Sequence, residues 1–122
     1  MAIAFNYIVE NDLFRVKASG KDENLEEVNA YGMVIIKAAL DHGSVRVLCD
    51  ESCLEYSLGT IDTFESARFI SQHAPKIAKI AILCRAEDFD TAIFWETVAV
   101  NRGLQVRVFN RADKAEEWLN IS

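Results

Sequence analysis

The chain has 122 residues, a length that suits one domain with a core of its own. Hydrophobic residues make up 51% and charged residues 26%, a composition typical of a globular protein. The net charge of −6 argues against nucleic acid as a partner, because its phosphates are also negative. Basic clusters that would suit anionic lipid headgroups are also missing from the sequence. Neither a signal peptide nor an apolar run long enough to span a bilayer is recognisable, so we expect a cytoplasmic protein.

The first expected element is an antiparallel hairpin. Apolar residues alternate with smaller or polar ones through residues 3–9 and again through 13–19, which is the period of a strand. The residues between them, Glu10, Asn11 and Asp12, are turn formers. We expect this hairpin at or near the edge of a sheet.

A capped helix and a strand follow the hairpin. Asn24 and Glu27 have the spacing of a capping box, and Gly43 suits the end of the helix that they open. The apolar run 45–49 predicts a strand, and the polar stretch 50–61 is expected to be a loop.

The next helix is expected to be capped by Asp62 or Thr63 and to end before Pro75. The run 79–84 is almost entirely apolar, which predicts a central strand covered on both faces. Acidic residues at 87–90 then favour another helix start, because they lie at the positive end of the helix dipole.

That third helix is expected to end at Gly103. A strand over 104–108 follows, then a short helix capped by Asn110 and anchored on the sheet by Trp118 and Leu119. The predicted order is ββαβαβαβα. It indicates an α/β fold with a single-layer mixed sheet of about five strands and helices packed on it.

This order, with Val106–Phe109 leading into Ala115–Leu119, resembles the SpoIIAA-like group of small α/β domains, which covers STAS and Sec14-like domains. The resemblance runs over the whole chain, so it implies one domain over 1–122. It includes Leu48-Cys49-Asp50 at a strand end and Trp95 in the helix before Gly103. It implies a non-catalytic regulatory or protein-interaction module.

Sporulation members of this group are anti-sigma-factor antagonists, switched by phosphorylation of a serine in an Asp-Ser-Ser-Gly type motif after the central strand. That motif is absent here, and Ser57, Thr60 and Thr63 are the hydroxyl residues near its position. The loop 50–61 also leaves the carboxyl end of a strand, where α/β sheets bind ligands. We therefore single out Asp50, Ser57, Thr60 and Thr63 as a candidate switch or ligand site. The alternative is that Asp62 or Thr63 only caps the next helix and that Ser57 is only a turn residue.

The first and third predicted helices carry more apolar residues than contact with a sheet requires. A helix that packs on one face of a sheet needs an apolar stripe only about 100° wide. Three explanations are open: ordinary packing, a protein interface that includes a homodimer, or a groove for a small apolar molecule or lipid between these helices and the sheet. The candidate interface or groove residues are Met33, Ile36 and Leu40 on the first helix and Phe89, Ile93 and Val100 on the third.

Nothing local in the sequence indicates catalysis, a metal or a cofactor. Cys49 and Cys84 lie in apolar strands and are expected to be buried and reduced. The Cys49–Cys53 spacing fits no usual zinc site. We therefore expect a protein that is not an enzyme. A deep pocket that holds a carboxylate or thiol with a strongly perturbed pKa would argue otherwise, because active sites are assembled in space.

Overall fold

The computed structural model describes residues 3–75 and 78–120 and contains one five-stranded sheet. The strands lie side by side in the order in which they occur in the chain. Strand β1 pairs antiparallel with β2, and each later strand pairs parallel with the one before it. The strands are β1 (Ile3–Glu10), β2 (Leu13–Asp22), β3 (Arg46–Tyr56), β4 (Lys79–Leu83) and β5 (Gln105–Phe109). The predicted α/β fold with a mixed sheet and its element order is confirmed.

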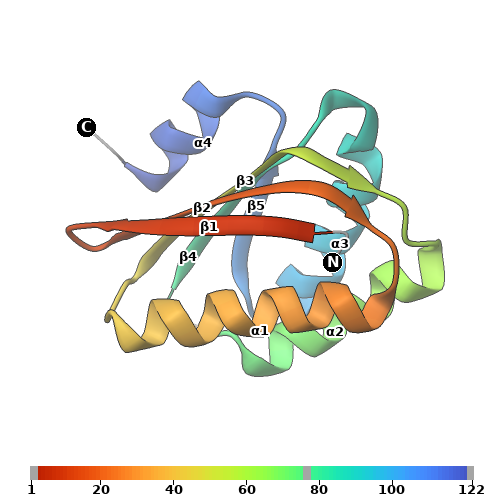
Figure 1. Cartoon of the computed structure of the whole chain (residues 1–122), viewed down its shortest axis with the longest axis horizontal. Helices are drawn as coiled ribbons and strands as arrows, with labels where there is room; N and C mark the ends of the chain where they lie inside the picture. Colours follow the sequence, from red (N-terminus) through yellow and green to blue (C-terminus); the bar gives the residue numbers. More distant parts are fainter. Residues whose placement is uncertain (1–2, 76–77, 121–122) are drawn as a thin grey trace.

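Helices cover both faces of the sheet, three on one and one on the other (Figure 1). The three are α1 (Leu25–Asp41), α2 (Thr60–His73) and α3 (Phe89–Asn101), and the fourth is α4 (Ala112–Leu119). A short 3-10 turn, η1 (Ala86–Asp88), leads into α3. Because α1 packs on α2 and α2 on α3, helix α2 lies between the other two.

The sheet therefore separates two cores. On the α1–α3 face, Phe14 and Val16 of β2 meet Tyr31 and Ile35 of α1. On the α4 face, the alternate residues of the parallel strands point the other way. That second core consists of Leu13, Leu48, Ala81, Leu83 and Phe109 with Ala115 and Leu119 of α4.

The hairpin and the first helix agree with their sequence signals. Asn11 occupies the turn with φ 57°, a left-handed conformation that asparagine tolerates. The Asn24 side chain caps α1 by accepting a hydrogen bond from Glu27 N at 2.8 Å. Glu27 in turn accepts a bond from Ile3 N at 3.4 Å, which ties α1 to the start of β1.

Three predicted boundaries are wrong. Residues 50–56 are not a loop, because they extend β3 alongside the end of β2 as far as the Asp22–Tyr56 pair. Helix α2 therefore starts earlier, at Thr60 after Gly59, and neither Asp62 nor Thr63 is its cap. Helix α4 is preceded by Arg111 rather than capped by Asn110. In β3, pairing with β2 overrides a polar sequence that by itself favours a loop.

Helix α4 is anchored mainly by Leu119. This side chain is fully buried, whereas Trp118 is half-buried, with its ring 5.9 Å from that of Phe109. Lys79 Nζ lies 4.6 Å from the centre of the Trp118 ring and donates a hydrogen bond to the Trp118 carbonyl at 2.6 Å. The expected anchoring role of the pair is thus concentrated in the smaller side chain.

We predict that Leu119→Ala lowers the free energy of unfolding by about 2–5 kcal/mol, because it leaves a cavity in the α4 core. Trp118→Ala should cost less, since part of its ring already contacts water. Urea melts of both variants measure the difference. A larger loss for Trp118→Ala than for Leu119→Ala would show that the tryptophan is the anchor.

Candidate functional site

A β-bulge in β3 shapes the most distinctive site of the molecule. Lys17 of β2 pairs with Asp50, but Ser19 pairs with Cys53, so two residues of β3 lie opposite Ala18. The extra residue changes the alternation of side chains between the faces. As a result, Glu51 and Tyr56, an odd number of positions apart, both line the α1–α3 side of the sheet.

Glu51 is a buried carboxylate held by two tyrosines. Tyr31 of α1 donates from its hydroxyl to Glu51 Oε2 at 2.8 Å, and the Tyr56 hydroxyl donates a short hydrogen bond to Oε1. Only 8% of the surface of Glu51 is exposed. The Tyr31 ring packs edge-on against Phe5 at 5.0 Å, so its position is fixed by packing as well as by the bond.

These three groups line a cavity of about 140 Å³ between the sheet and helices α1, α2 and α3. Its walls are mainly apolar, for example Ile35, Ile70 and Ala92. Gly32 lets α1 approach α2 closely here, because a Cβ at this position would lie 2.3 Å from Ile70 Cδ1. Among the described residues that line the cavity, none is a lysine, arginine or histidine.

Burial dominates the electrostatics of the cavity. It raises the pKa of the Glu51 carboxyl, while the bonds from Tyr56 and Tyr31 act in the opposite direction. Burial and the nearby Glu51 charge raise the pKa of both tyrosines well above the ordinary value. The tyrosines therefore stay neutral donors, and the described residues that line the cavity include no cation to balance the charge of Glu51.

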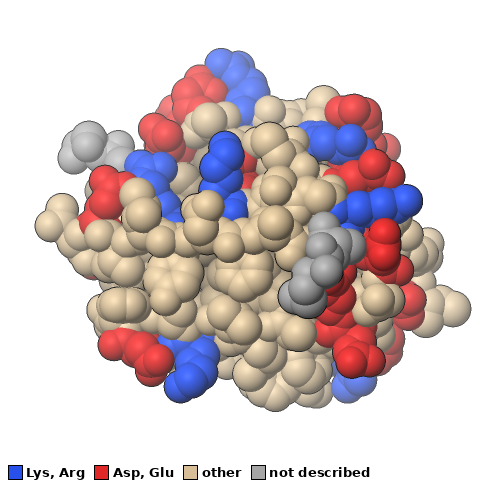
Figure 2. All heavy atoms as spheres, viewed as in Figure 1, with Lys and Arg blue, Asp and Glu red and all other residues tan. Residues whose placement is uncertain are grey.

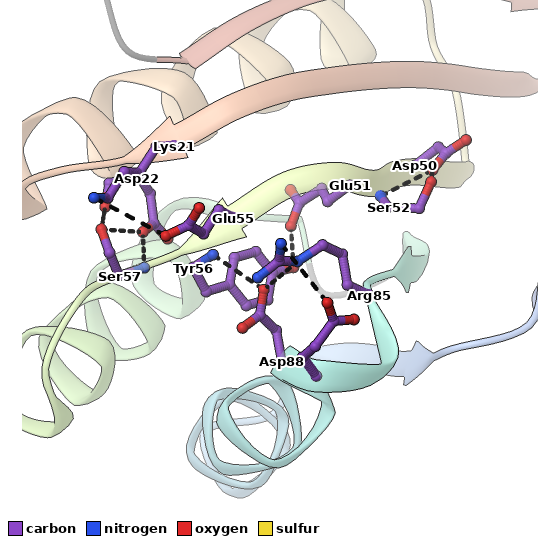
Figure 3. A network of polar contacts seen from close by, with 11 residues as sticks. Lys21, Asp22, Asp50, Glu51, Ser52, Glu55, Tyr56, Ser57, Arg85 and Asp88 are labelled. Atoms are coloured by element: carbon purple, nitrogen blue, oxygen red, sulfur yellow. Dashed lines mark hydrogen bonds and ion pairs between the residues drawn. The ribbon is translucent and has the colours of Figure 1, made fainter.

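The end of β3 is fixed from two further directions (Figure 3). Asp22, buried at the end of β2, accepts a short hydrogen bond from Ser57 N, and Ser57 Oγ donates to the Asp22 carbonyl. Asp88 accepts a bond from Tyr56 N at 3.2 Å and is itself held by Arg85 Nε at 2.9 Å. Tyr56 is thus positioned through its backbone as well as through its hydroxyl.

The four residues singled out as a switch or ligand site do not form one cluster. Asp50 accepts hydrogen bonds from the Ser52 hydroxyl at 2.6 Å and from Lys17 Nζ at 3.4 Å. It is the neighbour of Glu51 in the chain, but its side chain lies on the other face of the strand. Thr63 is buried within α2 and bonds the Gly59 carbonyl at 2.9 Å. Ser57 bonds Asp22, and Thr60 is exposed at the first residue of α2.

The six apolar candidate residues divide between packing and exposure. Ile36 packs against the α2–α3 core and lines the cavity, Phe89 packs near Cys84, and Met33 is half-buried. By contrast, the exposed ones are Leu40 at 55%, Ile93 at 37% and Val100 at 47%. Because α2 separates α1 from α3, the six do not line one groove between those two helices.

The predicted burial of Cys49 and Cys84 is confirmed, and Cys53 is exposed. Within residues 3–75 and 78–120, no group of three or more metal-binding side chains comes together. Over the same residues, no helix is long and apolar enough to cross a membrane.

Sequence reasoning missed Glu51, Tyr31 and Tyr56 as a group. A signal for the carboxylate was present, since alternation places Glu51 on the same strand face as Val47 and Cys49. Interpreting residues 50–61 as a loop hid that alternation. The bulge that brings Tyr56 to the same face has no sequence signature that we recognise.

We predict that Glu51 makes unfolding dependent on pH. Because its carboxyl pKa is higher in the folded chain than the ordinary 4.5, the folded state holds the proton more tightly. Its contribution to the free energy of unfolding is therefore full at low pH and is lost as pH rises from 4.5 through the folded-state pKa. The loss is about 1.4 kcal/mol for each pH unit between the two pKa values.

Denaturant melts across this pH range should show Glu51→Gln gaining stability relative to the wild type as pH rises. Glu55→Gln is the matched control, because Glu55 is an exposed carboxylate on the same strand. Parallel curves for the wild type and Glu51→Gln would contradict the prediction.

Comparisons with known proteins agree with this fold. No curated protein matches the chain significantly. An anti-sigma factor antagonist from Mycobacterium paratuberculosis has a similar structure, with a TM-score of 0.68, 14% identity and coverage of 97% of this chain and 94% of that chain. An uncharacterized DUF3478-family protein with a SpoIIAA-like fold from Shewanella loihica PV-4 gives a TM-score of 0.54, 19% identity and the same coverage. A family model matches residues 13–120, and the chain belongs to the SpoIIAA-like family.

Proposed function

We propose that this domain is a non-catalytic regulatory module of the cytoplasm that acts by binding another protein chain. Membership of the SpoIIAA-like family and the similar structure of an anti-sigma factor antagonist support a regulatory role. The observation that carries the proposal is the free edge of β1, an eight-residue strand at the end of the sheet. An exposed apolar edge strand is a ready template for another chain.

The β1 edge exposes Tyr7, Ile8 and Val9, at 40%, 56% and 37%. Figure 2 shows the face that contains this edge, where a broad uncharged area is bordered by charged side chains. Glu10 is the one charged residue of β1, and Arg15 of the same hairpin pairs with it at 2.8 Å. Lysine and proline, which usually protect an edge, do not occur in the strand.

The opposite edge of the sheet is protected. Strand β5 has five residues, and Glu96 of α3 accepts a hydrogen bond from Val108 N at 2.7 Å. In β1, the bond from Ile3 N to Glu27 covers the first residue and shows that Ile3 N points away from β2. In an antiparallel strand, Phe5, Tyr7 and Val9 then also direct their N–H and C=O groups outward.

A second copy of this chain is the partner that we propose for the edge. Two β1 strands can pair antiparallel about a two-fold axis at Tyr7, which places Phe5 opposite Val9. In this register the two Glu10 carboxylates lie about 20 Å apart, so they do not repel strongly. Tyr7 would then meet its own counterpart, Val9 would meet Phe5, and Ile8 would lie opposite Asn6 of the second copy.

The raised pKa values of the two buried thiols argue against a role for them as catalytic nucleophiles and agree with a binding role. Burial raises the pKa of Cys84 to about 11 and that of Cys49 well above the ordinary value. Both therefore remain protonated and weakly nucleophilic at neutral pH. Glu51 is the buried, perturbed carboxylate that would argue for an enzyme, and its two tyrosine partners also suit the recognition of a ligand.

We predict that the wild type is a dimer and that Ile8→Lys is a monomer in size-exclusion chromatography with light scattering. The lysine places a charge in the proposed contact, while the site is exposed enough to keep the fold. Ile61→Lys, at a position that is 78% exposed on α2, is the matched control and should stay dimeric. A monomeric wild type, or an unchanged Ile8→Lys, would contradict the proposed pairing.

A second candidate function is the binding of a small apolar molecule in the cavity. The volume of about 140 Å³ supports this candidate, because a cavity of about 150 Å³ takes up benzene. A ligand with a single aromatic ring fits a cavity of this volume better than a lipid with full acyl chains. The domain would then act as a sensor, with its ligand between the sheet and all three helices of that face.

A further inference from the structure

We propose that the cavity binds a small protonated primary amine, with its ammonium group against Glu51 and its apolar body against the walls. This inference rests on the second function proposed above, since it names the chemical class of the cavity ligand. Three observations carry it: the hydrogen-bonding capacity of the carboxylate, the absence of a cation among the described lining residues, and the size of the cavity.

The carboxylate has hydrogen-bonding capacity to spare. An ionised carboxylate offers about four acceptor positions, and the tyrosines occupy one on each oxygen. The hydroxyl oxygens of Tyr31 and Tyr56 can each also accept a bond. A primary ammonium has three N–H donors, so Glu51 and the two hydroxyls together match its donors in number.

The charge of the site favours a cation over other polar groups. A buried carboxylate without a neighbouring cation is costly, and an ammonium removes part of that cost while it gains charge-assisted hydrogen bonds. A ligand carboxylate or phosphate would instead meet Glu51 with like charge. Asp22, which also lines the cavity, adds to the negative potential there.

The walls select an apolar body of limited size. Tyr31 and Trp95 contribute aromatic surface, and the Trp95 ring is held by a hydrogen bond from Nε1 to Ser66 Oγ at 3.2 Å. Ile35 and Ile70 add aliphatic surface on the helix side. Benzylamine, in which one methylene group joins a single aromatic ring to the nitrogen, matches both the volume of the cavity and its one-sided polarity at Glu51.

The test compares three probes of equal size: benzylammonium, benzyl alcohol and ethylbenzene, each titrated calorimetrically or by ligand-observed NMR. We expect benzylammonium to bind the wild type roughly tenfold to a hundredfold more tightly than ethylbenzene, because a charge-assisted bond is worth that much. Its affinity should rise with pH as Glu51 loses its proton. Glu51→Gln should abolish the preference, and Glu55→Gln, the exposed control on β3, should keep it.

Tyr31→Phe provides a second test if Glu51→Gln does not fold, since it removes one hydroxyl and retains the ring. It should weaken benzylammonium and leave ethylbenzene nearly unchanged. If ethylbenzene binds and benzylammonium does not, the cavity still takes apolar ligands and the amine inference is wrong. If no probe binds, both the inference and the second proposed function are wrong.

Discussion

The extra residue of β3 opposite Ala18 is the constraint on which the site depends. Without it, strict alternation would place Glu51 on one face and Tyr56 on the other. With it, both side chains reach the space under α1–α3, where Tyr31 comes from a helix far away in the sequence. A local irregularity in one strand thus assembles a polar group inside an otherwise apolar layer.

Keeping Glu51 charged inside the apolar layer costs free energy. Burial works against the charged form of Glu51, and two tyrosine hydroxyls only partly offset this effect. The end of β3 is held by two further hydrogen bonds, from Ser57 N to Asp22 and from Tyr56 N to Asp88. Among the described lining residues no cation neutralises this buried carboxyl, and a cationic ligand is the partner that would do so.

Much of the fold could be predicted from local signals. Alternation in the hairpin, the Asn24 cap and the stop at Gly43 are determined by neighbouring residues, and each agrees with the structure. The extent of β3 could not be predicted, because residues 50–56 are polar and become a strand only by pairing with β2. The site escaped prediction for the same reason, since Glu51, Tyr31 and Tyr56 meet through that pairing and through the packing of α1.

The ionisation of Glu51 itself tests the account most directly. A carbon-13 NMR titration of its side-chain carboxyl follows the proton at the atom in question. We expect a midpoint above 4.5 in the free protein and a lower midpoint when benzylammonium is present. A midpoint at or below 4.5 in the free protein would show that burial does not dominate the ionisation of Glu51, and it would contradict a carboxyl whose charge needs a ligand to balance it.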